Sequence, residues 1–326
     1  MAKKVKYSEV FKQYNIPRNV VKGTPTQRFF RYIYRNRAAY FMILPVIVGV
    51  LVFCYYPPIY GMYLAFTDKT ANAASGAFIG FKNFEELFNN PEFWGYFWTM
   101  IQIQTPRLIT GVIVPLIYAE LIFGLSSDKA QGAYRLLILL PTVAPGVVSS
   151  LVWKQMFAAD GLINDIFIGL GFIDDAHRIA FLLEVNWVIP AILYMGFPWI
   201  GGSAVLIYLS GIMNIPKDFF EAADLDGATN WQKIWKIHIY LISGQIRYFL
   251  IFGLIGGLQD YGTQVVMTSG GPAGATTVPG YFMFKQMDEY GNYGKASAIG
   301  FILFVIIMIL TVILNKFVKF GDSKDD

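Results

Sequence analysis

The sequence predicts an all-α integral membrane protein with six transmembrane helices. Of its 326 residues, 55% are hydrophobic and only 15% are charged, a composition too apolar for a soluble domain of this size. Runs long enough to cross a hydrocarbon core of about 30 Å recur along the chain. Four of them carry no Asp, Glu, Lys or Arg: 38–67, 136–153, 185–216 and 296–315. Two more carry one central charge each, Arg107 in 93–119 and Asp260 in 248–284.

The prolines and glycines of these runs indicate bends and exits. Pro45 and the pair Pro57-Pro58 would break a soluble helix, but neighbouring helices can satisfy the freed carbonyls in a membrane bundle. We therefore expect bends there and no helix ends. The run 248–284 exceeds one crossing, so it is expected to leave the membrane near the glycine-rich stretch 268–280.

Lys and Arg set the orientation, because basic residues that flank a span stay on the cytoplasmic side. With both termini inside, 19 of the 26 basic residues fall in cytoplasmic segments, whereas the loop 158–184 carries five acidic residues against Arg178 alone. The predicted organisation is a basic cytoplasmic segment 1–37, a six-helix transmembrane domain 38–318 with a cytoplasmic loop 214–243, and a cytoplasmic tail 319–326.

The first 37 residues contain ten basic side chains and Glu9 as the one acid. No small-residue cleavage site follows a short apolar stretch, so a removed signal peptide is not expected. This segment is either a helix on anionic headgroups or a positive tail that sets topology. In the first case basic and apolar faces would be formed by Arg28, Arg31 and Arg35 and by Phe29, Tyr32 and Ile33. Cys54 is the one cysteine, which excludes a disulfide within the chain and a cysteine metal site.

The loop 214–243 reads as two short helices. Asn214 is placed to cap a helix whose first residue is Pro216, and Asp218 and Glu221 fall in the early turns where the helix dipole favours negative charge. Gly227 is expected to end this helix in a left-handed conformation. A second helix over 231–240 then returns the chain to the membrane.

Small residues in the first helix would let a partner approach closely. Ala222, Ala223 and Gly227 are the small positions, and Phe219 and Phe220 are expected to anchor the helix end by burial. The alternative is an amphipathic surface loop with well-formed caps.

This segment resembles the EAA loop of permease subunits in ATP-binding-cassette importers, whose usual form is EAA, three residues, G, and later I-x-L-P. The matching residues are Glu221, Ala222, Ala223, Asp226, Gly227, Ala228, Trp231, Ile237 and Ile239. Tyr240 stands where the pattern has proline. Other stretches resemble the sugar-importer branch in the same order along the chain: YYPPIYGMYLAFTD at 55–68, FIGFKNFEELF at 78–88, DGLIN at 160–164 and TSGGPAGATT at 268–277.

The resemblance implies a type I permease fold with a cytoplasmic EAA coupling helix, in the bacterial inner membrane. Two permeases would form the path for a sugar or oligosaccharide that an extracytoplasmic binding protein delivers. The resemblance favours a second permease that is a different chain. Two ATPase subunits would hold ATP and Mg, so this chain would bind no cofactor and catalyse no reaction; it has no G-x-x-x-x-G-K-[ST] phosphate loop, and no nucleic acid is implied. The residues that would couple to the ATPase are Phe219, Phe220, Glu221, Ala222, Ala223, Asp226 and Gly227.

Polar groups inside the spans are costly, so each needs a partner or a wet cavity. We hypothesise an ion pair between Arg107 and Asp260, which either fixes helix register or contacts the sugar. Sugars bind to polar groups and aromatic faces. Candidates for the substrate path are Gln102, Gln104, Arg107, Trp153, Tyr194, Gln259, Asp260 and Tyr261. The alternative for the aromatic ones is the interfacial belt.

The remaining titratable residues suggest no chemistry of their own. His177 and His238 lack other ligands at metal spacing and are expected to be surface or packing residues. Glu85-Glu86 and Asp174-Asp175 are either solvated or contacts for the binding protein. The rival function is a self-sufficient transporter or channel driven by an ion gradient, and a membrane-embedded enzyme is a weaker third.

Overall fold

The computed structural model describes residues 26, 32–73 and 75–317, and the elements that it defines in these ranges are all helical. The predicted all-α class is confirmed. The expected faces of the N-terminal segment and the tail 319–326 lie largely outside the described residues. The chain divides into two compact units, residues 1–63 with 323–326 and residues 64–322.

The first unit contains one apolar helix. It comprises α3 (Arg37–Gly49), the π-helical turn η2 (Val50–Tyr55) and α4 (Tyr56–Leu64), which together form a 28-residue span candidate. Pro45 lies inside α3, and Pro57 and Pro58 lie inside α4. The helix continues through all three, as predicted. The wide turn of η2 directly precedes the proline pair, where helices commonly accommodate such a strain.

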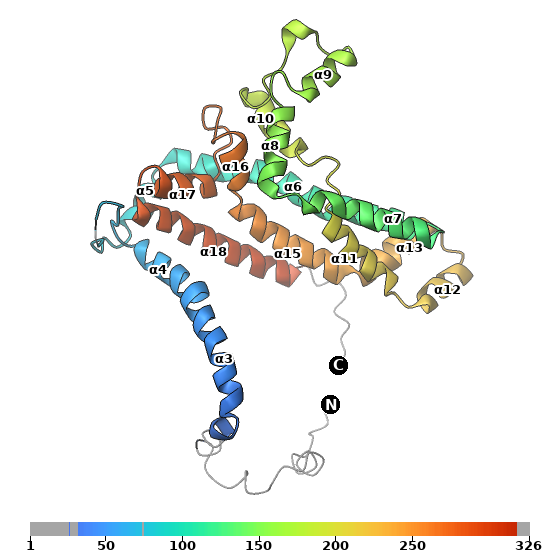
Figure 1. Ribbon diagram of the computed structural model, residues 1–326, viewed down its shortest axis with the longest axis horizontal. Helices are drawn as coiled ribbons and strands as arrows, with labels where there is room; N and C mark the ends of the chain where they lie inside the picture. The colour runs from blue at the N-terminus through green and yellow to red at the C-terminus, as the bar shows by residue number, and fades with distance from the viewer. Residues whose placement is uncertain (1–25, 27–31, 74, 318–326) are drawn as a thin grey trace. The chain divides into compact units, whose positions relative to one another are not determined.

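The second unit is a bundle of long and broken helices (Figure 1). Its larger elements are α5 (Lys82–Phe88), α6 (Pro91–Phe123), α7 (Asp128–Leu139), α8 (Gly146–Met156), α9 (Leu162–Gly169), α10 (Val185–Tyr194), α11 (Gly202–Met213), α12 (Lys217–Leu225), α15 (Ser243–Gln259), α16 (Gly262–Met267), α17 (Pro279–Asp288) and α18 (Tyr293–Phe317). Short turns are η3 (Leu140–Val143), η4 (Asp175–His177), α13 (Asn230–Lys233), η5 (Ile234–His238) and α14 (Ile239–Leu241).

The 33-residue helix α6 is the centre of this unit. Asn90 caps it by accepting a hydrogen bond from the Glu92 amide at 3.0 Å, and Pro91 takes the first helical position, where no amide is needed. One half of α6 packs with α10, α15, α17 and α18 in a cluster that includes Phe93, while its other half packs with α7, α11 and the start of α15 around Tyr208. The two larger core clusters therefore both contain residues of α6.

Two of the predicted single spans are broken. The run 136–153 bends by 85° between α7–η3 and α8, where Ala144 and Pro145 are extended. The run 185–216 forms α10 and α11, with left-handed backbone at Gly196 and Gly201 between them. The reason is local, because proline removes an amide donor and these glycines reverse the backbone within what is otherwise an apolar stretch.

The run 248–284 is divided as well. Its helix α15 starts earlier, at Ser243, where it bends by 65° from the helix 230–241, and it ends at Gln259. Asp260 is extended and α16 follows, so a helix break precedes the glycine-rich stretch 268–280. Our expectation that the chain leaves the membrane near that stretch stays a prediction. The charge of Asp260 marks the break, because its carboxylate binds groups outside α15.

The described residues contain three helices long and apolar enough to cross a membrane, or up to five if each bent pair is one span. Two shorter apolar helices, α10 and α11, come in addition. The predicted total of six stays a prediction.

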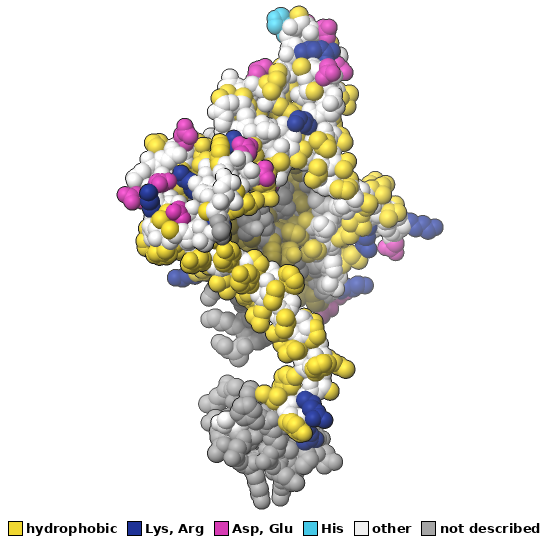
Figure 2. Space-filling view, turned by 60° about the vertical axis from the view of Figure 1, so that its left-hand side comes forward, with side chains coloured by type: hydrophobic (Ala, Val, Ile, Leu, Met, Phe, Trp, Pro, Cys, Tyr) yellow, Lys and Arg dark blue, Asp and Glu magenta, His cyan; other side chains and the backbone are white. Residues whose placement is uncertain are grey.

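The loop 158–184 forms a lobe that contains α9, at the upper end of the view in Figure 1. Figure 2 shows acidic and basic side chains gathered at its tip, whereas hydrophobic side chains cover much of the surface below. The charged side chains of this loop therefore lie at the surface of the lobe.

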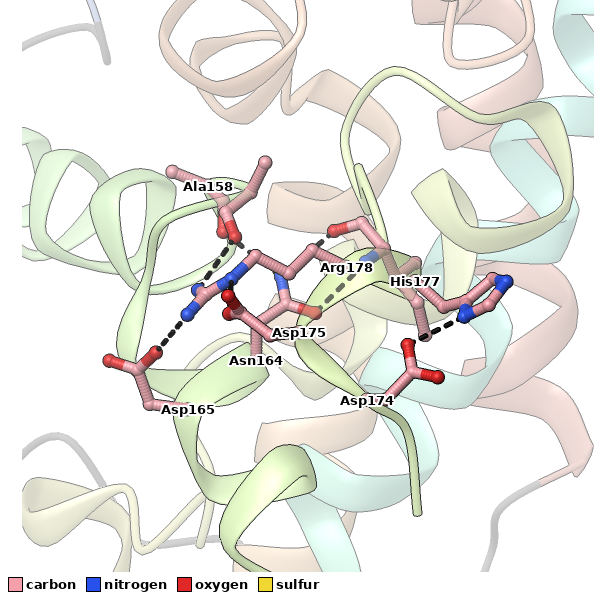
Figure 3. A network of polar contacts seen from close by, with 9 residues as sticks. Ala158, Asn164, Asp165, Asp174, Asp175, His177 and Arg178 are labelled. Atoms are coloured by element: carbon pink, nitrogen blue, oxygen red, sulfur yellow. Dashed lines mark hydrogen bonds and ion pairs between the residues drawn. The ribbon is translucent and has the colours of Figure 1, made fainter. Parts of the chain in front are cut away.

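Arg178 and Asn164 hold the lobe together (Figure 3). The guanidinium binds Asp175 at 2.8 Å, Asp165 at 3.0 Å and the carbonyl of residue 159 at 3.1 Å. The Asn164 amide spans the gap between the carbonyls of residues 158 and 179. The hydrogen bond to Asp175 raises the pKa of Arg178. Acid and base thus satisfy one another inside the lobe.

His177 is exposed, and its Nδ1 lies 2.5 Å from Asp174. The hydrogen bond from His177 lowers the pKa of the Asp174 carboxyl. His177 is therefore a surface residue, as predicted.

At the contact between α7 and α11, adding one methyl group should lower the stability of the protein. A Cβ at Gly202, the first residue of α11, would lie 2.1 Å from the Ile138 carbonyl oxygen. Gly202→Ala must displace a helix backbone, so we expect it to lower the free energy of unfolding by about 1–3 kcal/mol. Denaturant titration of the purified protein in detergent measures this. The control is Gly146→Ala at the first residue of α8, where a Cβ meets nothing within 4 Å; equal midpoints for the two variants would contradict the packing.

Candidate functional site

Two sites stand out in the second unit, and the first is the helix α12 with its turn. Its C-terminus has the Schellman arrangement: the Ala228 amide donates to the Ala223 carbonyl at 2.9 Å, and the Gly227 amide donates to the Asp224 carbonyl at 3.1 Å. Gly227 has φ +69°, which confirms the predicted left-handed helix end. The helix therefore has a sharply defined end despite its length of nine residues.

The start of α12 differs from the prediction. Asn214 is the C-cap of α11, where its backbone amide donates to the carbonyls of Ser210 and Gly211, and it does not cap α12. Pro216 is the N-cap of α12 and not its first helical residue. The reason is that α11 extends to the residue before Asn214, which leaves that backbone committed to the preceding helix.

The second helix of the loop begins with a capping box. Thr229 and Gln232 bond each other's backbone amides, which fixes the start of the helix 230–241. Lys233 forms an ion pair with Asp224 of α12. The predicted pair of short helices is confirmed, and this ion pair links them.

The predicted coupling residues divide between a face of α12 that packs against the bundle and a face that is exposed. Ala223 is buried, and Phe220 packs against Phe123 at the end of α6. Glu221, Ala222, Asp226 and Gly227 are exposed. Phe219 is 48% exposed, so our expectation that it anchors the helix by burial is wrong; the helical turn between neighbours directs it away from Phe220.

Sequence reasoning missed Leu225, which is 90% exposed at the end of α12. Its only sequence signal is an apolar residue in a charged turn. Leu225 places an apolar side chain on the exposed face of α12, next to Asp226.

The second site lies inside the bundle, where Arg107 of α6 meets the end of α15. The guanidinium Nη1 lies 2.9 Å from Oδ2 of Asp260, so the predicted ion pair is confirmed. Thr263 completes it: its hydroxyl donates to Asp260 at 2.9 Å and lies 3.4 Å from Arg107. The two charged side chains remain about one-quarter exposed, at 25% and 27%. The pair neutralises both charges and still borders open space.

That space is a cavity of about 420 Å³ between α6 and α15. Three predicted path residues line it, Gln104, Arg107 and Asp260, together with the glycine-rich face of α15. Gln104 is 9% exposed, and its Nε2 has no hydrogen-bond partner within the described part of the chain. The cavity thus has a polar wall formed by Gln104, Arg107 and Asp260.

The other path candidates lie elsewhere. Gln102 and Gln259 are exposed, and Tyr261 stacks on Phe284 at 5.5 Å. Trp153 stacks on Phe157 in a third core cluster, and Tyr194 stacks on Phe197. These five are not among the residues that line the cavity. Sequence reasoning missed Thr263 and the glycines of α15, because neither has a signal apart from the packing of α15 on α6.

Metal ligation has no support in the described ranges, which contain no group of three His, Cys, Asp or Glu placed to hold an ion. His238 is buried, as a packing residue would be, but it pairs with Glu120 at 2.9 Å. Sequence reasoning missed this pair, whose members lie 118 residues apart.

Comparison with known proteins places the fold. The family model for the binding-protein-dependent transport system inner membrane component matches residues 28–320. The chain therefore belongs to this family of multi-pass membrane transport components.

Individual relatives agree in length and architecture. The chain is 29% identical over 286 residues to the probable ABC transporter permease protein YesP of Bacillus subtilis, covering 86% of this chain and 90% of the relative. It is 28% identical over 292 residues to the arabinooligosaccharides transport system permease protein AraP of the same organism, covering 86% and 88%. A solved bacterial alginate ABC transporter, in complex with an alginate pentasaccharide-bound periplasmic protein, contains a chain with TM-score 0.78 and 25% identity, covering 90% and 97%. The fold is that of a type I ABC permease, and the predicted resemblance to sugar-importer permeases is confirmed.

If Arg107 and Asp260 pair, the effects of mutating them on the free energy of unfolding should not be additive. Arg107→Ala leaves the Asp260 carboxylate in a low-dielectric site, so we expect a loss of about 1–3 kcal/mol of unfolding free energy. Adding Asp260→Ala should restore part of that loss, because the unpaired charge is then gone. Unfolding of the four proteins in detergent gives the coupling energy. Glu86→Ala, which breaks the more exposed pair with Lys295, serves as the control at about 1 kcal/mol or less; additive losses at 107 and 260 would refute the pairing.

Proposed function

We propose that this chain forms half of the translocation path of an ATP-driven sugar or oligosaccharide importer, with α12 as its coupling helix. The observation that carries the proposal is the division of α12 into a face rooted in the bundle through Phe220 and Ala223 and an exposed face with Leu225, in a chain of this transport family.

In this proposal the exposed face of α12 sits in a cleft of an ATPase subunit. Leu225 supplies the apolar anchor, and Glu221 and Asp226 supply polar contacts around it, an arrangement typical of interface cores and rims. The two ATPase subunits bind ATP and Mg, and this chain holds no cofactor and carries out no catalysis. Closure of the ATPase pair then displaces α12 as a rigid element.

The proposed contact between α12 and a cytoplasmic ATPase implies the orientation of the chain in the membrane. The loop 214–243 faces the cytoplasm together with the segment 1–37 and the tail 319–326, and the domain 38–318 crosses the membrane six times. The six spans are the three long helices 37–64, 91–123 and 293–316, the bent pair α7–α8, the α10–α11 region, and α15 without the cytoplasmic helix 230–241 that precedes it. The acidic lobe 158–184 then faces outward, where an extracytoplasmic binding protein approaches. A second permease, a different chain, completes the path.

The sugar class is supported by the relatives, which are named for arabinooligosaccharides, for multiple sugars and for trehalose and maltose. The cavity agrees with that class. Its wall combines an amide donor, a guanidinium and a carboxylate with apolar side chains such as Leu108 and Phe249, as hydroxyl-bearing rings require. We place Gln104, Arg107 and Asp260 on the substrate path.

An ion-gradient-driven transporter is the second candidate, and the intramembrane charges favour it. The ion pair weakens it, because Arg107 and Asp260 compensate one another at 2.9 Å and neither is left to carry a coupling ion.

Loss of the apolar anchor should release the ATPase. Leu225→Asp places a carboxylate where the partner would bury a leucine, so we expect co-purification of the ATPase subunit in detergent to fall by about tenfold or more. Since Leu225 contacts so little of its own chain, stability should not change. Leu170→Asp, at another exposed leucine in the lobe, is the matched control. Equal recovery of ATPase with both variants would exclude α12 as the docking helix.

Filling the cavity should block transport without affecting docking. A Cβ at Gly257 would lie 3.1 Å from Oε1 of Gln104, so Gly257→Leu must enter the cavity and displace that amide. We expect uptake into proteoliposomes to fall about tenfold or more while ATPase association stays unchanged. Gly244→Leu is the control on the same helix, because a Cβ there meets nothing within 4 Å. Normal uptake by the Gly257 variant would remove the cavity from the path.

A further inference from the structure

A nearly buried hydrogen-bonded pair, His238 and Glu120, lies where η5, α6 and the start of α12 meet. His238, the last residue of η5, is 4% exposed, and its Nδ1 lies 2.9 Å and 3.0 Å from the two carboxylate oxygens of Glu120 in the last turn of α6. The Glu120 side chain is 11% exposed. A carboxylate only accepts hydrogen bonds, so Nδ1 carries the proton between them.

Two phenylalanines clamp the imidazole. Phe123 of α6 and Phe220 of α12 each lie 5.4 Å from its ring centre, at interplanar angles of 89° and 73°, and they lie 6.1 Å from one another. Edge-to-face contacts of this kind hold both distance and angle. The imidazole therefore contacts α12 through one ring and α6 through the other ring and Glu120.

The chemistry of the pair makes this junction stiff. An apolar contact can slide with little cost, whereas separating Glu120 from His238 would leave a carboxylate without its partner in a site closed to water. The other ring nitrogen of His238 has no partner among the described residues, so Glu120 is its principal polar contact. Any displacement of α12 that keeps Phe220 on the imidazole must carry the end of α6 with it.

The helix α6 extends from this junction to the cavity without a break. Glu120 lies 13 residues beyond Arg107, about 20 Å along the helix axis at 1.5 Å per residue. One continuous helix, with Pro115 inside it between these points, thus joins the contact with α12 at Glu120 to the polar wall of the cavity at Arg107.

We propose that Glu120 and His238 are positioning residues that make α12 and the end of α6 move as one body. The displacement of α12 by the ATPase then reaches Arg107 and the cavity through the axis of α6. This inference rests on the proposed function, since it assigns the path by which the coupling helix acts.

The first test measures the movement itself in the full complex. Spin labels on Leu121 of α6 and Lys217 of α12, both exposed and neither placed in the proposed ATPase contact, are introduced on a Cys54→Ala background. Labels on an otherwise wild-type chain should report one distance distribution, unchanged between the nucleotide-free and ATP-bound states, because the pair moves together. In His238→Ala we expect a broader distribution that shifts on adding ATP. A shift in the wild-type background would overturn the proposal, even if the variant does not fold.

The second test measures sugar uptake per ATP hydrolysed in proteoliposomes. For His238→Ala and Glu120→Ala we expect ATPase association to persist while this ratio falls about five- to tenfold, the size of a typical coupling between sites. Glu120→Gln keeps an acceptor for Nδ1–H and should retain most of the ratio. Lys295→Ala, which breaks the ion pair between α5 and α18, should leave the ratio unchanged.

The outcomes separate the two proposals. A wild-type ratio in both alanine variants, with Leu225→Asp still losing the ATPase, overturns the positioning role alone. Retention of the ATPase by Leu225→Asp, or uptake by the wild-type complex that needs no ATP, overturns the proposed function and the positioning role with it.

Discussion

The ion pair between Arg107 and Asp260 allows α15 to stop inside an apolar bundle. A helix that ends there exposes backbone groups and a carboxylate to a medium with no water to solvate them. Asp260 lies just after the last residue of α15. The guanidinium of Arg107 and the hydroxyl of Thr263 donate to its Oδ2, and the backbone amide of Thr263 donates to its Oδ1. The chain can then turn into α16 and form the polar wall of the cavity. Without the guanidinium, the break would carry an unpaired charge.

The helix α6, which supplies Arg107 to the end of α15, is itself unbroken. It supplies the guanidinium at its middle, packs against broken or short helices along its length, and ends at Glu120 and Phe123 beside the root of α12. Because α7–α8, α10–α11 and α14–α15 each bend or stop, α6 and α18 are the long unbroken helices among the described residues of the second unit. Pro106 and Pro115 lie inside α6, which nevertheless stays one helix over its 33 residues. Continuity between the two ends of a helix is the property that a mechanical coupling requires.

The helix α12 is small, and its stability has identifiable local sources. Nine residues seldom form a helix alone in water, but a Schellman end at Gly227, the ion pair from Asp224 to Lys233 and the packing of Phe220 fix both its conformation and its place. These contacts occupy one side, so the other side is left free for a partner. A rigid helix loses little conformational entropy on docking, which favours tight contact through a small surface.

The sequence by itself determined the helical class, the apolar runs, the left-handed end at Gly227, the passage of the helix through Pro45 and Pro57-Pro58, and the pairing of Arg107 with Asp260. These depend on local chemistry, or on the high cost of a lone charge in lipid, and both can be read from residue type. Only the tertiary structure decided where the long runs break, that Asn214 belongs to α11, that Phe219 faces outward while Phe220 is clamped, and that Glu120 meets His238. Such features depend on which distant side chains pack together, and hydropathy alone does not encode the partner that a polar or aromatic group will find across the bundle.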